Sequence, residues 1–265
     1  MIKLIASDVD GTLLEEGTDK INPEIFDMIL KLREKGIIFA AASGRAYGSL
    51  RRLFEPVKDN IVFITDNGSN VICRGEEMYA SVIDRALLEE LILRIRMLPE
   101  CYIVISDRKG MCYLEQENES LDDFLINGYH NDVRHVEDIL KEPIEITKCS
   151  IYKKQGIKEL APEFIEKYKG RLNVAIAGDI WLDFMNMDAD KGTALQSIQK
   201  TMRILPEESM AFGDNMNDIG MLKAVGESYA VSTAAEAVKA EAKHIAGTYT
   251  EDGVLKVLKN LVENQ

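Results

Sequence analysis

The first hydrophobic run of the chain leads straight into two carboxylates. Lys3 to Leu13 reads KLIASDVDGTL, so apolar residues precede Asp8-Val9-Asp10 and the chain then breaks at Gly11. A short, nearly continuous apolar run predicts a buried parallel strand. Ligands bind beyond the carboxyl ends of such strands, and carboxylates there are costly to bury without a cation or hydrogen bonds. The segment predicts a functional site, and the alternative is an acidic turn with Asp10-Gly11 as an ordinary turn dipeptide.

A β-α-β pattern continues from this strand to about residue 83. Asn22-Pro23 predicts the start of a helix with one apolar face, Gly36 predicts its end, and a second apolar run over 37–42 leads to Ser43-Gly44-Arg45. The elements expected next are a helix at 46–54, a strand at 61–65, a tight turn at Asn67-Gly68 and a hairpin through 71–79.

The middle of the chain has a different character. Its pattern predicts helices at 87–98 and 157–168 and strands at 101–106, 111–115, 144–152, 172–177 and 181–185. Hairpin strands mixed with helices favour an α+β insert over a continuation of the parallel sheet.

From Lys191 the first pattern returns. It predicts helices at 192–202, 219–225, 234–242 and 254–261 and strands at 209–212, 228–231 and 244–246. We therefore predict an α/β protein with a doubly wound, mostly parallel, Rossmann-like core sheet formed by 1–83 and 186–265. The insert is predicted at 84–185 as an α+β domain.

Composition and charge narrow the function classes. Hydrophobic residues make up 46% and charged residues 29% of the chain, as in ordinary globular proteins. The formal net charge of −13 argues against binding to nucleic acid or to an anionic membrane, but it permits a small anionic substrate. No apolar run approaches the about 20 residues that span a bilayer, and Asp8 and Asp10 interrupt any signal peptide. No pattern indicates an oligomeric state.

The four cysteines show no CxxC spacing, which favours scattered thiols over disulfides or zinc and fits a reducing cytoplasm. We expect a cytoplasmic location.

Polar clusters follow predicted strands or begin predicted helices at four places. They are Asp8-Val9-Asp10, Ser43-Gly44-Arg45, Lys191-Gly192-Thr193 and Gly213-Asp214-Asn215-Met216-Asn217-Asp218. Because the carboxyl ends of parallel strands share one edge of the sheet, these clusters are expected to converge. Several carboxylates suit Mg²⁺, a lysine and a hydroxyl suit a phosphoryl group, and an aspartate can act as a covalent nucleophile.

Each cluster also has a structural explanation. Ser43-Gly44 can be a simple turn, Lys191 a solvated residue in the first turn of a helix, and Asp214 or Asp218 a helix cap. Because all four clusters lie at the ends of predicted strands or the starts of predicted helices, we favour one site formed by all of them over four separate structural roles.

These motifs resemble those of the haloacid dehalogenase superfamily of phosphatases, specifically the Cof-like branch with a type IIB-like cap inserted after the third core strand. The resemblance spans both core segments in order, whereas the insert matches only in size and strand-rich character. The motifs that carry it are Asp8-Val9-Asp10-Gly11-Thr12-Leu13, Ser43-Gly44-Arg45, Lys191-Gly192-Thr193-Ala194-Leu195 and Gly213-Asp214-Asn215-Met216-Asn217-Asp218, with Asn67-Gly68 and Glu251-Asp252-Gly253-Val254 as weaker positions.

The resemblance implies a role for each matched residue. Asp8 is implied to be the nucleophile and a Mg²⁺ ligand, and Asp10 the general acid and then the base, with its backbone carbonyl on the metal. The remaining implied roles are phosphoryl binding by Ser43, Gly44 and Lys191, metal ligation by Asp214, phosphate contact by Asn217, and support of Lys191 or of the metal's waters by Asp218.

The predicted function is Mg²⁺-dependent hydrolysis of a small phosphorylated metabolite through an aspartyl-phosphate. Phosphotransfer by a sugar-phosphate mutase and a non-catalytic regulatory protein are the alternatives. Two questions stay open. Gly178-Asp179-Ile180-Trp181 is a predicted turn of the insert, and either Asp179 or Trp181 contacts substrate or the segment is a solvated turn followed by a packed Trp. Arg45 either reaches substrate or pairs with a neighbouring carboxylate. The segment Val231-Ser232-Thr233-Ala234 departs from the Asn-Ala pair common in the branch, and Ser232 or Thr233 is expected to cap the next helix.

Overall fold

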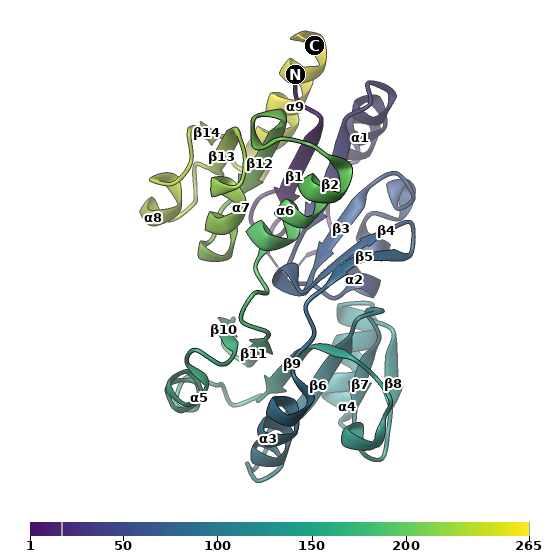
Figure 1. The fold of residues 1–265 in the computed structure, drawn as a ribbon, viewed down its shortest axis with the longest axis vertical. Coiled ribbons are helices and arrows are strands. Elements are labelled where there is room, and N and C mark those ends of the chain that lie inside the picture. The colour runs from purple at the N-terminus through teal and green to yellow at the C-terminus, as the bar shows by residue number, and fades with distance from the viewer. Residues whose placement is uncertain (17, 265) are drawn as a thin grey trace. The chain divides into compact units, whose positions relative to one another are not determined.

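The chain forms two compact units in the computed structural model, which describes residues 1–16 and 18–264 (Figure 1). The first unit comprises Met1–Arg45, Leu50–Tyr79 and Asp190–Gln265, and the second comprises Ala46–Ser49 and Ala80–Ala189. The insert limits of 84 and 185 stay predictions.

An eight-stranded sheet is the framework of the first unit, with the strand order β14-β13-β12-β1-β2-β3-β4-β5. Neighbouring strands from β14 to β3 pair in parallel, and β4 pairs with β3 in the antiparallel direction. This topology confirms the predicted α/β class with a mostly parallel sheet. The strands are β1 (Leu4–Asp8), β2 (Ile38–Ala42), β3 (Val62–Thr65), β4 (Asn70–Cys73), β5 (Glu76–Ala80), β12 (Ser209–Gly213), β13 (Glu227–Val231) and β14 (His244–Ala246).

Helices flank this sheet, as Figure 1 shows. They are α1 (Glu24–Glu34), α6 (Lys191–Met202), α7 (Ile219–Lys223), α8 (Glu236–Lys239) and α9 (Gly253–Asn264), with α2 (Tyr47–Leu53) shared between the two units. α1 begins at Glu24 with Pro23 as its N-cap, one residue later than Asn22-Pro23 predicted, and Asn22 Oδ1 accepts a hydrogen bond from the Glu24 backbone N–H at 3.0 Å.

The prediction that Ser232 or Thr233 caps the next helix is wrong. The N-cap of α8 is Ala235, which makes no side-chain capping bond. The Val231 carbonyl accepts a hydrogen bond from the Ala234 backbone N–H at 3.0 Å, so a turn lies between β13 and the helix. The helix consequently begins later and is shorter than the pattern 234–242 indicates.

The core of the first unit lies between the parallel strands and their helices. Every residue of β1 is buried, as its apolar run predicted. Leu4 and Ala6 of this strand pack in one cluster with Ala194, Leu195 and Ile198 of α6. Burial of such side chains contributes about 25 cal/mol to the free energy of folding for each Å² of apolar surface. This packing holds β1 against α6 and thereby positions the polar residues at the ends of these two elements.

The second unit contains a six-stranded sheet of order β10-β11-β9-β6-β7-β8, antiparallel except for the pair β7 and β8. Its strands are β6 (Tyr102–Asp107), β7 (Cys112–Leu114), β8 (Val133–His135), β9 (Ile146–Tyr152), β10 (Asn173–Ala177) and β11 (Trp181–Met185), and its helices are α3 (Arg85–Ile95), α4 (Glu119–Asp123) and α5 (Ala161–Tyr168).

Short helical turns complete the described chain. A π-helical turn covers Phe124–Gly128, and the 3₁₀ turns are Glu55–Val57, Asp66–Gly68, Ile139–Lys141, Pro206–Glu208, Met216–Asp218 and Tyr249–Glu251. No helix within the described residues is long and apolar enough to span a bilayer.

All four cysteines are free thiols, as their spacing predicted. Burial raises the pKa of the Cys149 thiol well above its ordinary value, so this residue behaves as a neutral core side chain.

Candidate active site

Three neighbouring strands of the first unit bring the predicted polar residues to one edge of the sheet. The order β12-β1-β2 places Asp214, Asp8 and Ser43 next to one another, because each lies at or just beyond the carboxyl end of its strand. Lys191 is the first residue of α6, which packs against β3 and β4. The predicted convergence of the four polar clusters therefore has a simple topological cause.

Lys191 lies at the centre of this edge and is buried. Its Nζ donates hydrogen bonds to Asp8 Oδ1 at 2.5 Å and to Asp218 Oδ1 at 2.7 Å, and the lysine side chain is 1% exposed. Burial alone would lower the pKa of Lys191, but the charges of Asp218 and Asp8 outweigh it and raise the pKa well above its ordinary value. The alternative of a solvated lysine at a helix start is excluded by this geometry.

Both carboxylate oxygens of Asp218 accept hydrogen bonds from the protein. Its Oδ1 accepts from Lys191, while its Oδ2 accepts from the backbone N–H groups of Asp214 and Asn215 at 2.9 and 3.0 Å. Asp218 therefore fixes the turn that follows β12 and does not make a side-chain cap on α7. Gly213 permits this turn, because a Cβ there would lie 2.5 Å from Asp218 Cβ.

Asp8 and Asp214 differ from Asp218 in how their oxygens are used. The Oδ2 atom of Asp8 is buried and has no hydrogen-bond partner among the described residues. Asp214 Oδ1 accepts a hydrogen bond from Thr12 Oγ1 at 2.8 Å. Gly11, with φ +88°, brings the backbone against Asp214, where a Cβ would lie 2.5 Å from Oδ2.

The charges of this cluster do not balance within the protein. The three carboxylates of Asp8, Asp214 and Asp218 offer ligand atoms within 4.8 Å of one another, and Lys191 supplies a single positive charge beside them. Burial and the charge of Asp218 raise the pKa of Asp8 and of Asp214 above the ordinary value. An unpartnered buried carboxylate oxygen and an excess of negative charge fit a divalent cation with oxygen ligands.

Asp10 belongs to a second, adjoining group of side chains. Arg45 holds its carboxyl group with both fork nitrogens, Nε to Oδ2 at 3.0 Å and Nη2 to Oδ1 at 2.7 Å. Ser43 Oγ donates to Asp10 Oδ2 at 3.3 Å, and Arg45 Nη1 also contacts Asp19 Oδ1 at 2.6 Å. The open question about Arg45 is thus answered in this structure in favour of carboxylate pairing.

The two carboxylates of the first motif therefore have separate surroundings. Asp8 faces Lys191 and Asp10 faces Arg45, because the chain leaves the strand after Asp8 and turns at Gly11. A continued strand would have pointed both side chains to the same face.

A third contact joins the loops after β3 and β12. Asn217 is exposed, and its Nδ2 donates to Asn67 Oδ1 at 2.9 Å. Gly44 faces the same amide, since a Cβ on it would lie 3.1 Å from Asn67 Oδ1. Gly68, with φ +94°, lies against the Asp190 carbonyl at a distance that no side chain permits. These loops fit together through small residues at the start of α6.

Three residues that shape the site, Asp190, Thr12 and Asp19, were not among its predicted residues. Asp190 caps α6 by accepting from the Gly192 and Thr193 backbone N–H groups, and an Asp directly before a helix is a recognisable cap. Thr12 stands in a quoted motif, but its contact with Asp214 joins residues 202 positions apart. Asp19 has no local pattern that links it to Arg45.

The turn that contains Asp179, one of the residues proposed to recognise substrate, lies between β10 and β11 of the second unit. Asp179 is exposed, and its carbonyl accepts a hydrogen bond from the Ile157 N–H at 2.9 Å. The Trp181 ring stacks on Phe124 at 6.3 Å between centroids and lies 5.0 Å from the Tyr152 ring. The packing of Trp181 on these rings matches the alternative of a solvated turn followed by a packed Trp, and recognition of substrate by either residue stays a prediction.

Comparison with known proteins agrees with this arrangement of motifs. The sequence matches the family model of haloacid dehalogenase-like hydrolases over residues 5–258. It is 28% identical over 273 residues to a 5-amino-6-(5-phospho-D-ribitylamino)uracil phosphatase of Escherichia coli, covering 100% of this chain and 97% of that protein. A Bacillus subtilis phosphatase of the same name is 28% identical over 266 residues, which cover 98% of this chain and 96% of that protein.

A solved structure shares the fold over nearly the whole chain. A protein from Eubacterium rectale superposes with a TM-score of 0.89 and is 36% identical, covering 98% of this chain and 99% of that one. The predictions of this superfamily and of a phosphatase-type hydrolase are confirmed by these matches. The chain therefore belongs to the family of haloacid dehalogenase-like hydrolases.

Proposed function

We propose that the protein hydrolyses small phosphomonoesters in a Mg²⁺-dependent reaction that passes through an aspartyl-phosphate on Asp8. The observation that carries this proposal is the state of the Asp8 carboxyl group. One of its oxygens is held by Lys191, and the other is buried without a partner among the described residues. A carboxylate fixed in this way is oriented for attack on a phosphorus atom and does not need to move first.

The cation is assigned to the cluster on the grounds of charge and of free ligand atoms. Asp8, Asp214 and the backbone carbonyl of Asp10 would hold the cation. Asp218 is not assigned as a ligand, because both of its oxygens already accept hydrogen bonds from the protein. Bound there, Mg²⁺ supplies electrostatic stabilisation of the negative charge that spreads over a transferring phosphoryl group.

The protein's own side chains carry the covalent steps. A carboxylate oxygen of Asp8 attacks phosphorus while the bond from phosphorus to the leaving oxygen breaks, and Asp10 gives its proton to that oxygen. Asp10 then takes a proton from water, the water oxygen attacks phosphorus, and the bond to Asp8 breaks to release phosphate. Arg45 and Ser43 hold the Asp10 carboxyl group, so Arg45 is a positioning residue in this scheme.

Phosphoryl binding is assigned to groups around the same edge. Lys191 lies beside Asp8 and Ser43 beside Asp10, so both can donate to oxygens of a phosphoryl group between the two aspartates. Gly44 follows Ser43 and lies against the Asn67 side chain, to which Asn217 donates a hydrogen bond, so Gly44 and Asn217 are assigned to the same phosphoryl site. The net charge of −13 makes the local cations the feature that attracts an anionic metabolite.

We infer the substrate class from the names of two relatives, and we assign the choice among substrates to the predicted insert. Two relatives are phosphatases of 5-amino-6-(5-phospho-D-ribitylamino)uracil, a phosphorylated sugar-alcohol derivative. We infer that this chain also acts on a phosphorylated sugar-like metabolite. The residues that choose among such metabolites are assigned to the insert, which carries its own sheet and core.

A screen of phosphorylated metabolites tests the proposed function. We expect release of inorganic phosphate from at least one sugar phosphate or from 5-amino-6-(5-phospho-D-ribitylamino)uracil, and loss of that release after Mg²⁺ is removed with EDTA. Chromatography of the products separates hydrolysis from phosphotransfer, because a mutase yields an isomeric hexose phosphate. Inactivity over the whole panel with Mg²⁺ present would instead favour a binding protein.

Mg²⁺ is expected to stabilise the folded protein, and Asp214→Asn to abolish this effect. A ligand at 100 times its dissociation constant adds about 2.7 kcal/mol to the free energy of unfolding, which corresponds to a rise in melting temperature of several degrees. Thermal unfolding followed by circular dichroism with and without Mg²⁺ measures the shift. Asp59→Asn, at an exposed position of the same unit, is the matched control and should keep the full shift. An equal shift in Asp214→Asn would place the cation elsewhere.

A further inference from the structure

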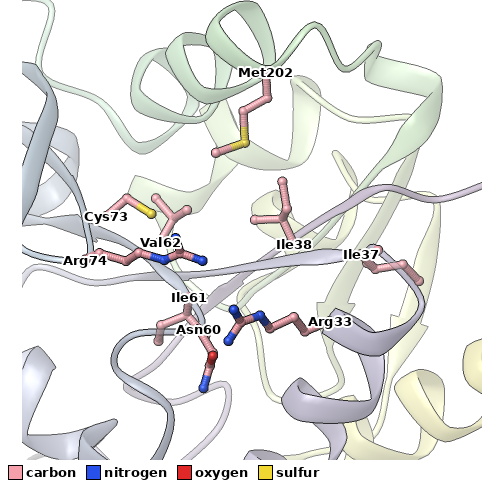
Figure 2. A pocket seen from close by; sticks show the side chains of 10 residues that line it. Arg33, Ile37, Ile38, Asn60, Ile61, Val62, Cys73, Arg74 and Met202 are labelled. Atoms are coloured by element: carbon pink, nitrogen blue, oxygen red, sulfur yellow. The ribbon is translucent and has the colours of Figure 1, made fainter.

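A pocket of about 360 Å³ lies in the first unit, away from the catalytic edge of the sheet (Figure 2). Ile38 and Val62, which line it, are the first residues of β2 and β3. Ser43, by contrast, follows the carboxyl end of β2. The pocket and the proposed active site therefore lie at opposite ends of the same strands, and a ligand in one does not occupy the other.

The walls of this pocket are apolar and continuous with the core. Val62 belongs to the core cluster of the first unit, and Ile38, Cys73 and Met202 pack against it. Figure 2 shows Met202 pointing from α6 toward Ile38, the first residue of β2. Such a surface favours the flat apolar part of a ligand over a bare inorganic ion.

Two arginines define the polar side of the pocket. Figure 2 shows Arg33 and Arg74 reaching toward each other from opposite sides. No acidic residue lines the pocket, and neither guanidinium forms an ion pair with any residue that the structure describes. The Nε of Arg74 donates to the Asp59 carbonyl at 3.3 Å, which leaves its terminal nitrogens available. Two unneutralised cations converge here in a chain with 45 acidic and 32 basic residues.

The backbone at Arg74 supplies a second, independent observation. Arg74 and Gly75 form the two-residue connection between β4 and β5, with φ angles of +52° and +79°. Positive φ at both positions favours Asn, Asp or Gly, so an arginine at the first of them is held at a local conformational cost. In this turn the Arg74 side chain reaches into the pocket.

We propose that this pocket binds a small organic phosphate whose non-phosphate part is flat and apolar. The guanidinium groups of Arg33 and Arg74 bind the phosphate oxygens, because their planar forks match phosphate geometry and carry the charge that a dianion requires. The apolar part of the ligand packs on Ile38, Val62 and Met202. This binding site is separate from the proposed reaction and needs neither Mg²⁺ nor turnover.

Phenylphosphonate is a suitable probe, because its carbon–phosphorus bond is not a phosphoester and its ring is flat. We expect its titration, without Mg²⁺, to shift the methyl NMR signals of Ile38, Val62 and Met202 with a single dissociation constant. The double variant Arg33→Gln and Arg74→Asn should bind at least about tenfold more weakly, since two charge-assisted contacts are lost. Benzoate, with one charge, and inorganic phosphate, without a ring, should both bind more weakly than phenylphosphonate.

The control is the double variant Arg51→Gln and Arg52→Gln, which removes the same charge from exposed positions of the first unit outside the pocket. It should bind phenylphosphonate as the wild type does. Asn is well suited to the conformation at position 74, so the pocket variant should melt no lower than the wild type. Absence of shifts at these methyl groups, equal weakening in both variants, or equal binding of inorganic phosphate would each overturn the proposal.

Discussion

Asp8→Asn is expected to lower kcat by about 10⁴-fold or more, a loss typical of removing a catalytic nucleophile. The amide cannot form the acyl-phosphate that the proposed reaction requires, although it has nearly the same shape as the carboxylate. Folding should survive the change. Burial and Asp218 already disfavour the charged form of Asp8 and raise its pKa, so a neutral group at this position relieves a cost. The amide oxygen can still accept the hydrogen bond of Lys191.

Steady-state phosphate release, normalised to folded protein, measures this effect. Acid quenching of the wild type during turnover, followed by mass spectrometry, should find a phosphoryl group on the peptide that contains Asp8. Asp27→Asn makes the same chemical change at an exposed position of α1 and should leave kcat unchanged. Substantial Mg²⁺-dependent phosphate release by Asp8→Asn would show that another group attacks phosphorus.

The elements that position the candidate site were predictable because their signals are local. β1 is an apolar run of buried residues, and the residue at its carboxyl end can be identified without any tertiary information. The same holds for β2 before Ser43 and for β12 before Asp214. Once these strands are assigned to one parallel sheet, the convergence of their polar ends follows from topology.

The partners of the site residues were not predictable, since they depend on long-range contacts. Nothing in the sequence near Arg45 indicates that it pairs with Asp10, which lies 35 positions away, and with Asp19. Asp218 was expected to support Lys191 or to cap a helix, and only the structure shows one oxygen on Lys191 and the other on backbone N–H groups. These bonds leave Asp8 and Asp214, but not Asp218, as the carboxylates proposed to bind the cation.

Residues 116–143 of the insert were not assigned to any element because each of their elements is short. α4, the π-helical turn at Phe124–Gly128 and β8 each have five residues or fewer. Hydrophobic periodicity needs a longer window to separate helix from strand. Leu121 and Leu125 are nevertheless buried, so tertiary packing fixes this segment more than local pattern does.

Lys191→Met is expected to lower the free energy of unfolding by about 3–5 kcal/mol in the presence of EDTA. The lysine is almost fully buried and donates to Asp8 and Asp218, so its removal leaves these carboxylates without a cation. Thermal or urea unfolding measures the loss. Lys200→Met makes the same change at an exposed position of α6 and should stay within about 0.5 kcal/mol of the wild type. Equal stability of the two variants would show that Lys191 does not stabilise the cluster.

The pH dependence of the Lys191→Met effect separates lost charge pairing from lost packing. In the wild type, the raised pKa of Lys191 means that its stabilising charge is fully present below pH 10.5 and is lost only at higher pH. Without this cation, the already raised pKa of Asp8 must rise further. The unfolded chain releases this proton at the ordinary carboxyl pKa, so the variant loses stability as pH rises from that value to the raised pKa of the folded state. The deficit should therefore be largest near neutral pH and should shrink as Asp8 becomes protonated in acid. Mg²⁺ at saturating concentration should reduce it at neutral pH, since the cation neutralises the same carboxylates. A deficit that stays constant with pH and with Mg²⁺ would instead indicate that Lys191 stabilises the protein by filling space.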